Sequence, residues 1–225
     1  MGTLYLVRHG QASFGADDYD QLSALGQRQS VRLGQYWRER GLRFDAVLTG
    51  TLRRHAQTWA GIAEGLQEVD AIDTPLLWPG LNEYDSAAVI AAIHPEPLPR
   101  PDTPELYRHH FRLLRDGLTQ WMNGVVSPRG MPSYNDFVAG VRGALDHVRH
   151  NCTGHVLIVS SGGPIATAVG QVLGTTPETT IEMNLRIRNT GVSEFLYTPK
   201  RHTLLSYNGL PHLDTPEHRD WITYA

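Results

Sequence analysis

The sequence predicts an α/β fold: a three-layer αβα sandwich around a mostly parallel sheet, with an antiparallel edge strand and an inserted helical lid region. Two observations lead to this prediction. Short apolar segments alternate along the chain with amphipathic segments of helical period, and right-handed crossovers between such elements favour a parallel sheet. An apolar content of 40% with 19% charged residues is typical of a chain that buries a core.

The first half of the chain predicts two strand-helix pairs. Residues 4–7 form a short apolar run typical of a buried strand, and residues 22–37 carry apolar side chains at helical spacing. Ser23 is a candidate N-cap of that helix and Gly41 a stop signal. A second short strand is predicted at residues 46–48. The helix after it has its apolar stripe at Leu52, Ala56, Trp59, Ala63 and Leu66.

The second half repeats the pattern. Residues 133–136 resemble a capping box, which predicts an amphipathic helix through Val148. Residues 156–159 are apolar and predict another buried strand. Pro164 suits the first position of the following helix, which we expect to end near Gly174.

A hairpin and an insertion complete the predicted domain. Residues 192–197 and 203–207 have strand character and are separated by a short polar turn, so they predict antiparallel strands on one side of the sheet. Residues from about 74 to 132 hold nine of the 14 prolines and one helix near residues 106–121. We expect a lid-type insertion over the sheet edge, within a single domain of residues 1–225.

Charge and composition exclude several classes of function. The net charge is only -3 and no run of Lys or Arg offers a nucleic-acid footprint. The single cysteine, Cys152, excludes an internal disulfide framework. Arg8 interrupts the first apolar run, which argues against a signal peptide, and the uncharged residues 156–177 contain a polar Ser-Ser-Gly-Gly turn that a membrane span would not favour. We therefore expect a cytoplasmic protein without membrane contact.

Polar side chains follow three of the predicted strands. Residues 8–10 are Arg-His-Gly, residues 160–163 are Ser-Ser-Gly-Gly, and Arg53 and Arg54 follow the strand at residues 46–48. The carboxyl ends of parallel strands are where open α/β sheets bind ligands. Glycines admit a close backbone approach, and a helix N-terminus adds a positive dipole end. The sequence therefore predicts an anion site, with phosphate as the obvious ligand.

A structural explanation of each group remains open at this point. An Arg-His-Gly tripeptide by itself is a weak signal, since such residues often form surface ion pairs or caps. Arg8 and His9 follow a buried strand, however, where they would be desolvated without a partner. Arg53 and Arg54 could both be solvated residues on a helix face, and we expect one of them to be.

Five segments together resemble the histidine phosphatase superfamily, the phosphoglycerate-mutase-like proteins. They are "LYLVRHGQ", "LSALGQRQ", "FDAVLTGTLRRHAQTW", "LNEYD" and "NTGVSEF", in the family's order and over nearly the whole chain. The ordered set is far more specific than any one motif.

The resemblance implies a role for each matching residue. His9 would be the nucleophile that forms a phosphohistidine, Arg8 and Arg54 would hold the phosphoryl oxygens, and Glu83 would act as general acid and then base. Other carboxylates that could take the acid role are Glu64, Glu68 and Asp85. The further phosphate-binding candidates are Gln11, Ser161, Gly162 and His212.

One position departs from the family. Where the family usually has a second histidine in an "SHGG" turn, this chain has Ser161, whose hydroxyl can donate one neutral hydrogen bond but carries no imidazolium charge. Loss of one well-placed donor typically costs on the order of a hundred-fold in rate. Another histidine could fill the gap: His212 is the preferred candidate, followed by His55 and His155. On the sequence alone, Ser161→His should raise turnover.

The expected function is hydrolysis of a phosphoric monoester through a phosphohistidine, by a histidine acid-type phosphatase of reduced or full activity. The substrate would be a small phosphorylated molecule, and inorganic phosphate would bind too. Two alternatives stay open: an impaired phosphate-ester-binding or regulatory protein, and a phosphoglycerate mutase. The insertion lacks the family's tandem-arginine mutase motif, although it offers Arg100, Arg108, Arg112, Arg115 and Arg129.

No cofactor or metal is expected, because the eleven histidines do not show ligand spacing with an acidic partner. Aromatic residues of the insertion and its flank are candidates for an apolar lid: Trp78, Tyr84, Tyr107, Phe111, Trp121 and Tyr134. The sequence does not determine the identity of the substrate. It does not determine the oligomeric state either, so a homodimer stays open.

Overall fold

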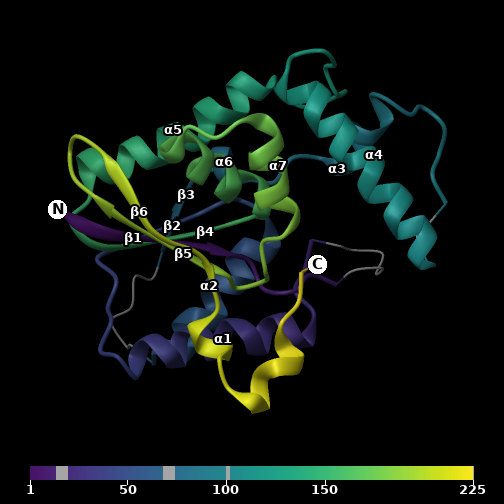
Figure 1. Cartoon of the computed structure of the whole chain (residues 1–225). Helices are drawn as coiled ribbons and strands as arrows, with labels where there is room; N and C mark the ends of the chain where they lie inside the picture. The colour runs from purple at the N-terminus through teal and green to yellow at the C-terminus, as the bar shows by residue number, and fades with distance from the viewer. Residues whose placement is uncertain (14–19, 68–73, 100–101, 225) are drawn as a thin grey trace.

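A six-stranded sheet runs through the centre of the molecule (Figure 1), in the strand order β3-β2-β4-β1-β5-β6. The computed structural model describes all residues except 14–19, 68–73, 100–101 and 225. The strands are β1 (Gly2–Arg8), β2 (Ala46–Thr49), β3 (Leu76–Leu77), β4 (Gly154–Ser160), β5 (Val192–Tyr197) and β6 (His202–Gly209). The helices are α1 (Ala24–Arg38), α2 (Arg53–Leu66), α3 (Ser86–Ala91), α4 (Pro104–Met122), α5 (Tyr134–Asn151), α6 (Gly162–Leu173) and α7 (Pro177–Leu185), with 3-10 turns η1 (Pro79–Leu81), η2 (Pro211–Leu213) and η3 (Pro216–Trp221).

The sheet is mixed, as predicted. Strand β4 pairs in parallel with both β1 and β2, and β2 pairs in parallel with β3. The hairpin of β5 and β6 adds the antiparallel pairs on one side, since β5 runs antiparallel to β1 and to β6. The carboxyl ends of β1, β2 and β4 consequently meet at one edge of the sheet.

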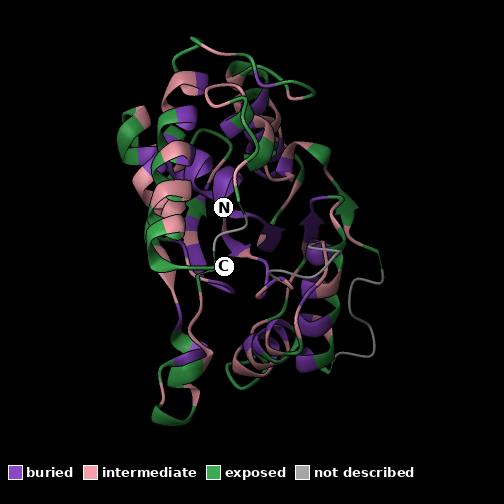
Figure 2. Cartoon of the chain, turned by 90° about the vertical axis from the view of Figure 1, so that its right-hand side faces the viewer, coloured by how far each residue is buried: buried purple, intermediate pink, exposed green. Residues whose placement is uncertain are grey.

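Alternation along the central strands produces the three layers. On β1, Leu4 and Leu6 belong to one buried cluster, whereas Tyr5 and Val7 belong to another on the opposite face. Figure 1 shows α1 and α2 covering one face and α5, α6 and α7 the other. Turned by 90°, the strands appear as a buried centre between helices whose outer faces are exposed (Figure 2). The predicted αβα sandwich is confirmed.

Helix boundaries follow the predicted caps, with one correction. Ser23 accepts a hydrogen bond from the amide of Gly26 at 3.0 Å, and Ser133 accepts one from the amide of Asp136 at 3.2 Å. Pro164 does not open its helix: α6 begins at Gly162, two residues earlier. A proline anywhere in the first turn is tolerated because its missing N–H would have no intrahelical partner there.

The region predicted as an insertion contains β3, η1, α3 and α4. In Figure 1, α3 and α4 project beyond the carboxyl edge of the sheet. The inner side of α4 is nevertheless buried, with Leu114, Leu118 and Trp121 in the same cluster as Leu4 and Leu6 of β1. No helix among the described residues is long and apolar enough to span a membrane.

Candidate active site

The three polar strand ends converge at one edge of the sheet. His9 directly follows β1, and its amide donates to the carbonyl of Ser160 at the end of β4 at 2.9 Å. Arg54 lies in the first turn of α2, the helix that follows β2. Glu83 comes from the segment after η1 and joins them at one cavity.

His9 is held in a defined orientation and tautomer. Its side chain is 2% exposed, and Nδ1 lies 2.7 Å from the carbonyl oxygen of Gly10. A carbonyl only accepts, so Nδ1 carries the hydrogen and Nε2 keeps its lone pair. The Nε of Arg54 donates to this Nε2 at 3.2 Å. Burial, followed by the nearby charges of Arg8 and Arg54, holds the His9 pKa well below its ordinary value, so the ring is neutral.

Arg54 is fixed by a carboxylate from a distant loop. Its side chain is largely buried, and Nη1 pairs with Oδ1 of Asp20 at 2.8 Å. Oδ2 of Asp20 accepts from the amide of Arg53 at 2.9 Å. Leu52, the N-cap residue of α2, has no side-chain acceptor, so Asp20 both caps this helix and orients the guanidinium.

Glu83 lies against the N-terminus of α6. Its two carboxylate oxygens are 3.1 and 3.2 Å from the amide nitrogen of Gly163, which donates to them. Burial raises the pKa of Glu83, although the Gly163 N–H and the charges of Arg54 and Arg8 oppose that rise. A carboxyl group with a raised pKa is suited to proton donation near neutral pH.

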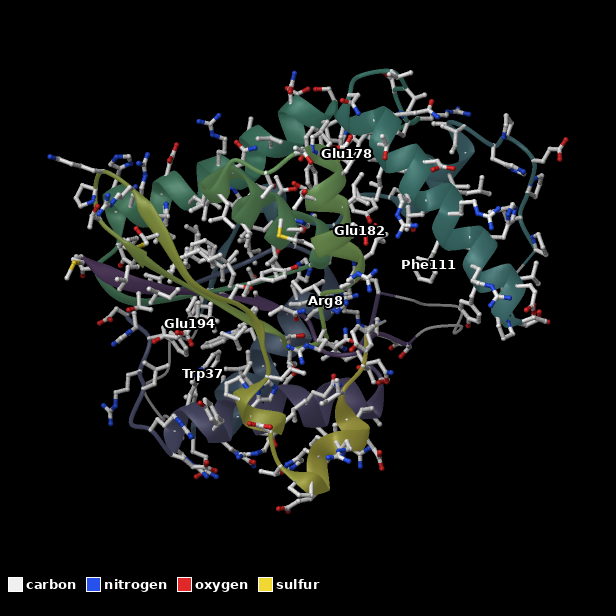
Figure 3. The ribbon with its side chains drawn as sticks, in the orientation of Figure 1. Arg8, Trp37, Phe111, Glu178, Glu182 and Glu194 are labelled. Carbon is white, nitrogen blue, oxygen red and sulfur yellow. The ribbon has the colours of Figure 1, made fainter. Side chains whose placement is uncertain are left out.

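These groups share a cavity of about 440 Å³. Nη1 of Arg8 donates to the carbonyl oxygens of Tyr224, at 2.6 Å, and Ile187. Figure 3 shows Arg8 near the end of β1. It also shows Phe111 on the side of α4 that faces Arg8. The lining residues are Arg8, His9, Leu52, Arg54, Glu83, Tyr84, Asp85, Ser86, His110, Phe111, Leu114, Asn184, Leu185 and Tyr224. Two guanidinium groups, a neutral imidazole and a carboxyl group thus meet in one space large enough for a small ester.

Ser161 is turned away from this cavity. It is fully buried, and its Oγ lies 2.7 Å from Nε2 of His55, a buried residue of α2. The ring centroids of His55 and His9 are 5.8 Å apart. A second imidazole therefore lies next to the first, and it comes from α2 rather than from the turn after β4.

Residues 4–209 match the model of the histidine phosphatase superfamily, branch 1. The chain belongs to this superfamily. The match covers every residue of the site described so far except Tyr224.

Several proteins of known structure or activity are similar to this chain. The chain is 35% identical over 63 residues to a broad-specificity phosphatase from Saccharomyces cerevisiae, a match that covers 25% of this chain and 27% of the yeast protein. A mutant phosphoserine phosphatase from Entamoeba histolytica, solved with phosphoserine, has a TM-score of 0.65 and 20% identity, covering 95% of this chain and all of the other. A phosphoglycerate mutase from Bacillus anthracis has a TM-score of 0.64 and 17% identity, with 94% of each chain covered. At these identities the solved structures establish the fold alone.

Within this superfamily member, His212 is not where the sequence suggested. It is buried in η2, and its Nε2 lies 2.9 Å from Oγ1 of Thr190. It does not line the cavity. Its partner Thr190 donates through its amide to the carbonyls of Arg8 and His9, so His212 contacts the scaffold behind the site. His155 is also remote, since it pairs with Thr3 at the opposite end of β1.

Two other phosphate-binding candidates serve the scaffold. Gln11 donates through its amide to Gln29 and accepts at Oε1 from Ser23, both at 2.8 Å, and does not line the cavity. Gly162 is buried in the first turn of α6 and does not line the cavity either; Gly163 is the residue whose amide reaches Glu83. Of the spare carboxylates, Asp85 lines the cavity, Glu64 is exposed on α2, and Glu68 lies outside the described residues.

Sequence reasoning missed several lining residues, among them His110, Asn184 and Tyr224. Asn184 belongs to α7, which Thr176 and Pro177 could have revealed as an N-cap and first helical residue. Nothing local marks Tyr224, because its contact with Arg8 spans 216 residues. Among the aromatic lid candidates, Tyr84 and Phe111 line the cavity, whereas Trp121 and Tyr134 pack edge to face at 5.2 Å.

Proposed function

We propose that this superfamily member hydrolyses small phosphoric monoesters through a phosphohistidine at His9. The observation that carries the proposal is the state of that imidazole. It is neutral, its Nδ1 is hydrogen-bonded to the carbonyl of Gly10, and its Nε2 faces the guanidinium of Arg54 at the cavity wall. A neutral imidazole is a competent nucleophile near neutral pH, and an adjacent guanidinium is the group that an incoming phosphoryl oxygen would bind.

In the first transfer, Nε2 of His9 attacks phosphorus and the bond to the ester oxygen breaks. Glu83 donates its proton to the departing alkoxide, so that a neutral alcohol leaves. Charge on the equatorial phosphoryl oxygens is met by Arg8 and Arg54, which are already in place and need little reorganisation. Asp20 keeps the Arg54 guanidinium at that position.

In the second transfer, the ionised Glu83 accepts a proton from water, and the oxygen attacks the phosphohistidine. The phosphorus–nitrogen bond breaks, which releases inorganic phosphate and restores neutral His9. Glu83 regains its proton, so each cycle returns to its starting state. Two transfers with one nucleophile split a difficult hydrolysis into two lower barriers.

The substrate class follows from the rest of the cavity. Beyond the arginines, the walls combine apolar side chains, such as Leu52, Phe111 and Leu185, with polar ones: Asp85, Ser86, His110 and Asn184. We expect a small ester whose alcohol part carries both apolar and hydrogen-bonding groups. The described residues hold no group of three or more His, Cys, Asp or Glu that could bind a metal, and the mechanism does not use one.

The test is release of inorganic phosphate from a panel of phosphomonoesters and phosphoanhydrides by the wild type and His9→Ala. The matched control is His150→Ala, an exposed histidine at the far end of α5. His9→Ala should lose activity by several orders of magnitude, and His150→Ala should match the wild type. Full activity of His9→Ala would overturn the proposal.

Two other outcomes correspond to the alternatives. A pure phosphate-ester-binding protein would bind phosphate yet release none from any ester, and no acid-stable or acid-labile phosphoenzyme would be trapped. A phosphoglycerate mutase would be activated by adding a bisphosphorylated cofactor. A hydrolase should be unaffected or inhibited by that addition, because the bisphosphate would compete for Arg8 and Arg54.

A further inference from the structure

His55 is a buried imidazole that the proposed mechanism leaves without a role. It is 0% exposed, and the only hydrogen bond of its ring among the described residues joins Nε2 to Ser161 Oγ at 2.7 Å. Nδ1 has no partner there and is enclosed by Gly50, where an added Cβ would lie 2.2 Å from it. Burying an imidazole with one nitrogen left without a hydrogen-bond partner lowers the free energy of unfolding. An apolar side chain at this position would avoid that cost.

The tautomer follows from this enclosure. A buried N–H without an acceptor is rarer in proteins than a buried acceptor without a donor. We therefore place the hydrogen on Nε2, which donates to Ser161 Oγ, and leave the lone pair on Nδ1. Burial, then the charge of Arg54, lowers the pKa of His55 to about 3, so the ring remains neutral wherever His9 works.

Ser161 also behaves unusually for its position. It is the N-cap residue of α6, yet its side chain makes no capping hydrogen bond and bonds His55 instead. The preceding residue, Ser160, accepts from the His9 amide, and Gly163 donates to Glu83. The Ser161–His55 bond thus ties α2 to residues 160–163, which contact both His9 and Glu83.

We propose that His55 is a positioning residue of the active site, and that with Ser161 it supplies from α2 the second imidazole that the turn after β4 lacks. Its ring, 5.8 Å from that of His9 between centroids, supports the nucleophile, and its bond to Ser161 fixes the turn that holds Glu83. The inference rests on the proposed function, since it assigns a role within the same reaction.

This pairing reverses the expectation for Ser161→His. The Cγ atom of a histidine at position 161 would take about the place of Ser161 Oγ, which is only 2.7 Å from Nε2 of His55. The ring atoms beyond Cγ would then overlap the ring of His55. Two imidazoles cannot occupy one buried site, so the single substitution should lower turnover unless His55 is replaced by a smaller residue at the same time.

The experiment is a double-mutant cycle on His55→Ala, Ser161→His and the combined variant, with His55→Gln as the conservative substitution. His55→Ala and Ser161→His should each lower kcat at least tenfold. The combined variant should be more active than either single variant, because one imidazole again fills the space. His55→Gln, whose amide can still donate to Ser161 Oγ, should retain more activity than His55→Ala.

Three further measurements distinguish a role in positioning from a loss of protein stability. The inhibition constant of inorganic phosphate should change less than about threefold in His55→Ala, because Arg8 and Arg54 remain. The rate of phosphoenzyme formation in a single turnover should fall with kcat. Thermal unfolding midpoints show whether each variant is folded at the assay temperature.

Failure of this inference is distinct from failure of the proposed function. An inactive His9→Ala beside a fully active His55→Ala, or a Ser161→His variant with raised turnover, would overturn the role of His55 alone. Additive losses in the combined variant would do the same. A fully active His9→Ala would overturn the proposed function instead.

Discussion

His9 and Glu83 show how one cause, burial, shifts the pKa values of two residues in opposite directions, each in the direction that its proposed task needs. Desolvation disfavours the charged form of each group, so it lowers the pKa of the imidazole and raises that of the carboxyl. Burial therefore favours the deprotonated form of His9, the proposed nucleophile, and the protonated form of Glu83, the proposed acid. The two arginines strengthen the first effect and weaken the second.

The pH dependence of kcat/KM should report these two groups. Neutral His9 is present above its lowered pKa, so the acidic limb should lie below the ordinary histidine range. Protonated Glu83 is present below its raised pKa, so the rate on an alkyl phosphate should fall as pH rises through that value. Glu83→Gln cannot donate a proton, and it should lose about 10²- to 10⁴-fold and the alkaline limb with it.

The matched comparison is a substrate with a good leaving group. An aryl phosphate such as p-nitrophenyl phosphate leaves without a proton, so kcat/KM of Glu83→Gln should fall much less on it than on an alkyl phosphate. An alkaline limb that persists in Glu83→Gln would assign the acid role to another group, and Asp85 is the other carboxylate on the cavity wall.

At the scale of elements, the N-terminus of α6 holds Glu83, the proposed acid. Gly163 lies so close to Glu83 and Tyr84 that an added Cβ would be 2.2 Å from Glu83 Oε1 and 2.7 Å from Cδ1 of Tyr84. Only glycine lets the helix amide reach the carboxylate here. The close approach is required by the site and not by the helix, because the backbone of Gly163 is helical.

Gly163→Ala should therefore separate activity from folding. The substitution favours the helix by about 1 kcal/mol in propensity, but it must displace Glu83 or the ring of Tyr84. We expect kcat on an alkyl phosphate to fall at least tenfold while the protein still unfolds cooperatively. Steady-state kinetics and thermal unfolding measure the two effects.

Gly143→Ala is the control for this prediction. Gly143 also lies inside a helix, α5, and an added Cβ would approach only the Trp78 ring, with its nearest atom at 3.1 Å. Its activity should match the wild type. Equal activity of Gly163→Ala and the wild type would mean that Glu83 does not need this contact.

Elements with strong local signals were predicted well. The helices capped by Ser23 and Ser133 and the β5–β6 hairpin were found from the sequence, because caps, period and turn residues act within a few positions. The short α3 and the weakly amphipathic α7 were missed, since their place is set by packing against α4 and α6 more than by period.

For the whole molecule, the helix over the site is tied to the central core. Leu118 of α4 is 2% exposed and packs in the cluster that covers β1 and β4. The region of residues 74–132 thus shares a core with the sheet, which supports the prediction of one domain with a lid-type insertion. That organisation remains a prediction until unfolding is measured.

Leu118→Ala tests it. The substitution should lower the free energy of unfolding of the whole chain by about 2–5 kcal/mol, within one transition seen alike by far-UV circular dichroism and tryptophan fluorescence. Val125→Ala, at a side chain 69% exposed just after α4, should change it by less than about 0.5 kcal/mol. Two separate transitions would show that α4 folds independently.

The sequence by itself determined the order of the longer strands and helices, the mixed sheet and the position of His9 at the end of a buried strand. The period of apolar side chains is visible within each short segment of the sequence. The residues at the carboxyl ends of the predicted parallel strands, where ligands bind, can be read directly from those segments. The resemblance to the superfamily then supplied roles for Arg8, Arg54 and Glu83.

Only the tertiary structure decided which distant partners complete the site. Asp20 reaches Arg54 across 34 residues, and His55 meets Ser161 across 106. His212, preferred on the sequence, is instead buried against Thr190. A hydrogen bond between residues so far apart depends on how the layers pack, and no period or spacing in the chain records it, because each side chain in isolation is equally suited to a surface or a cap.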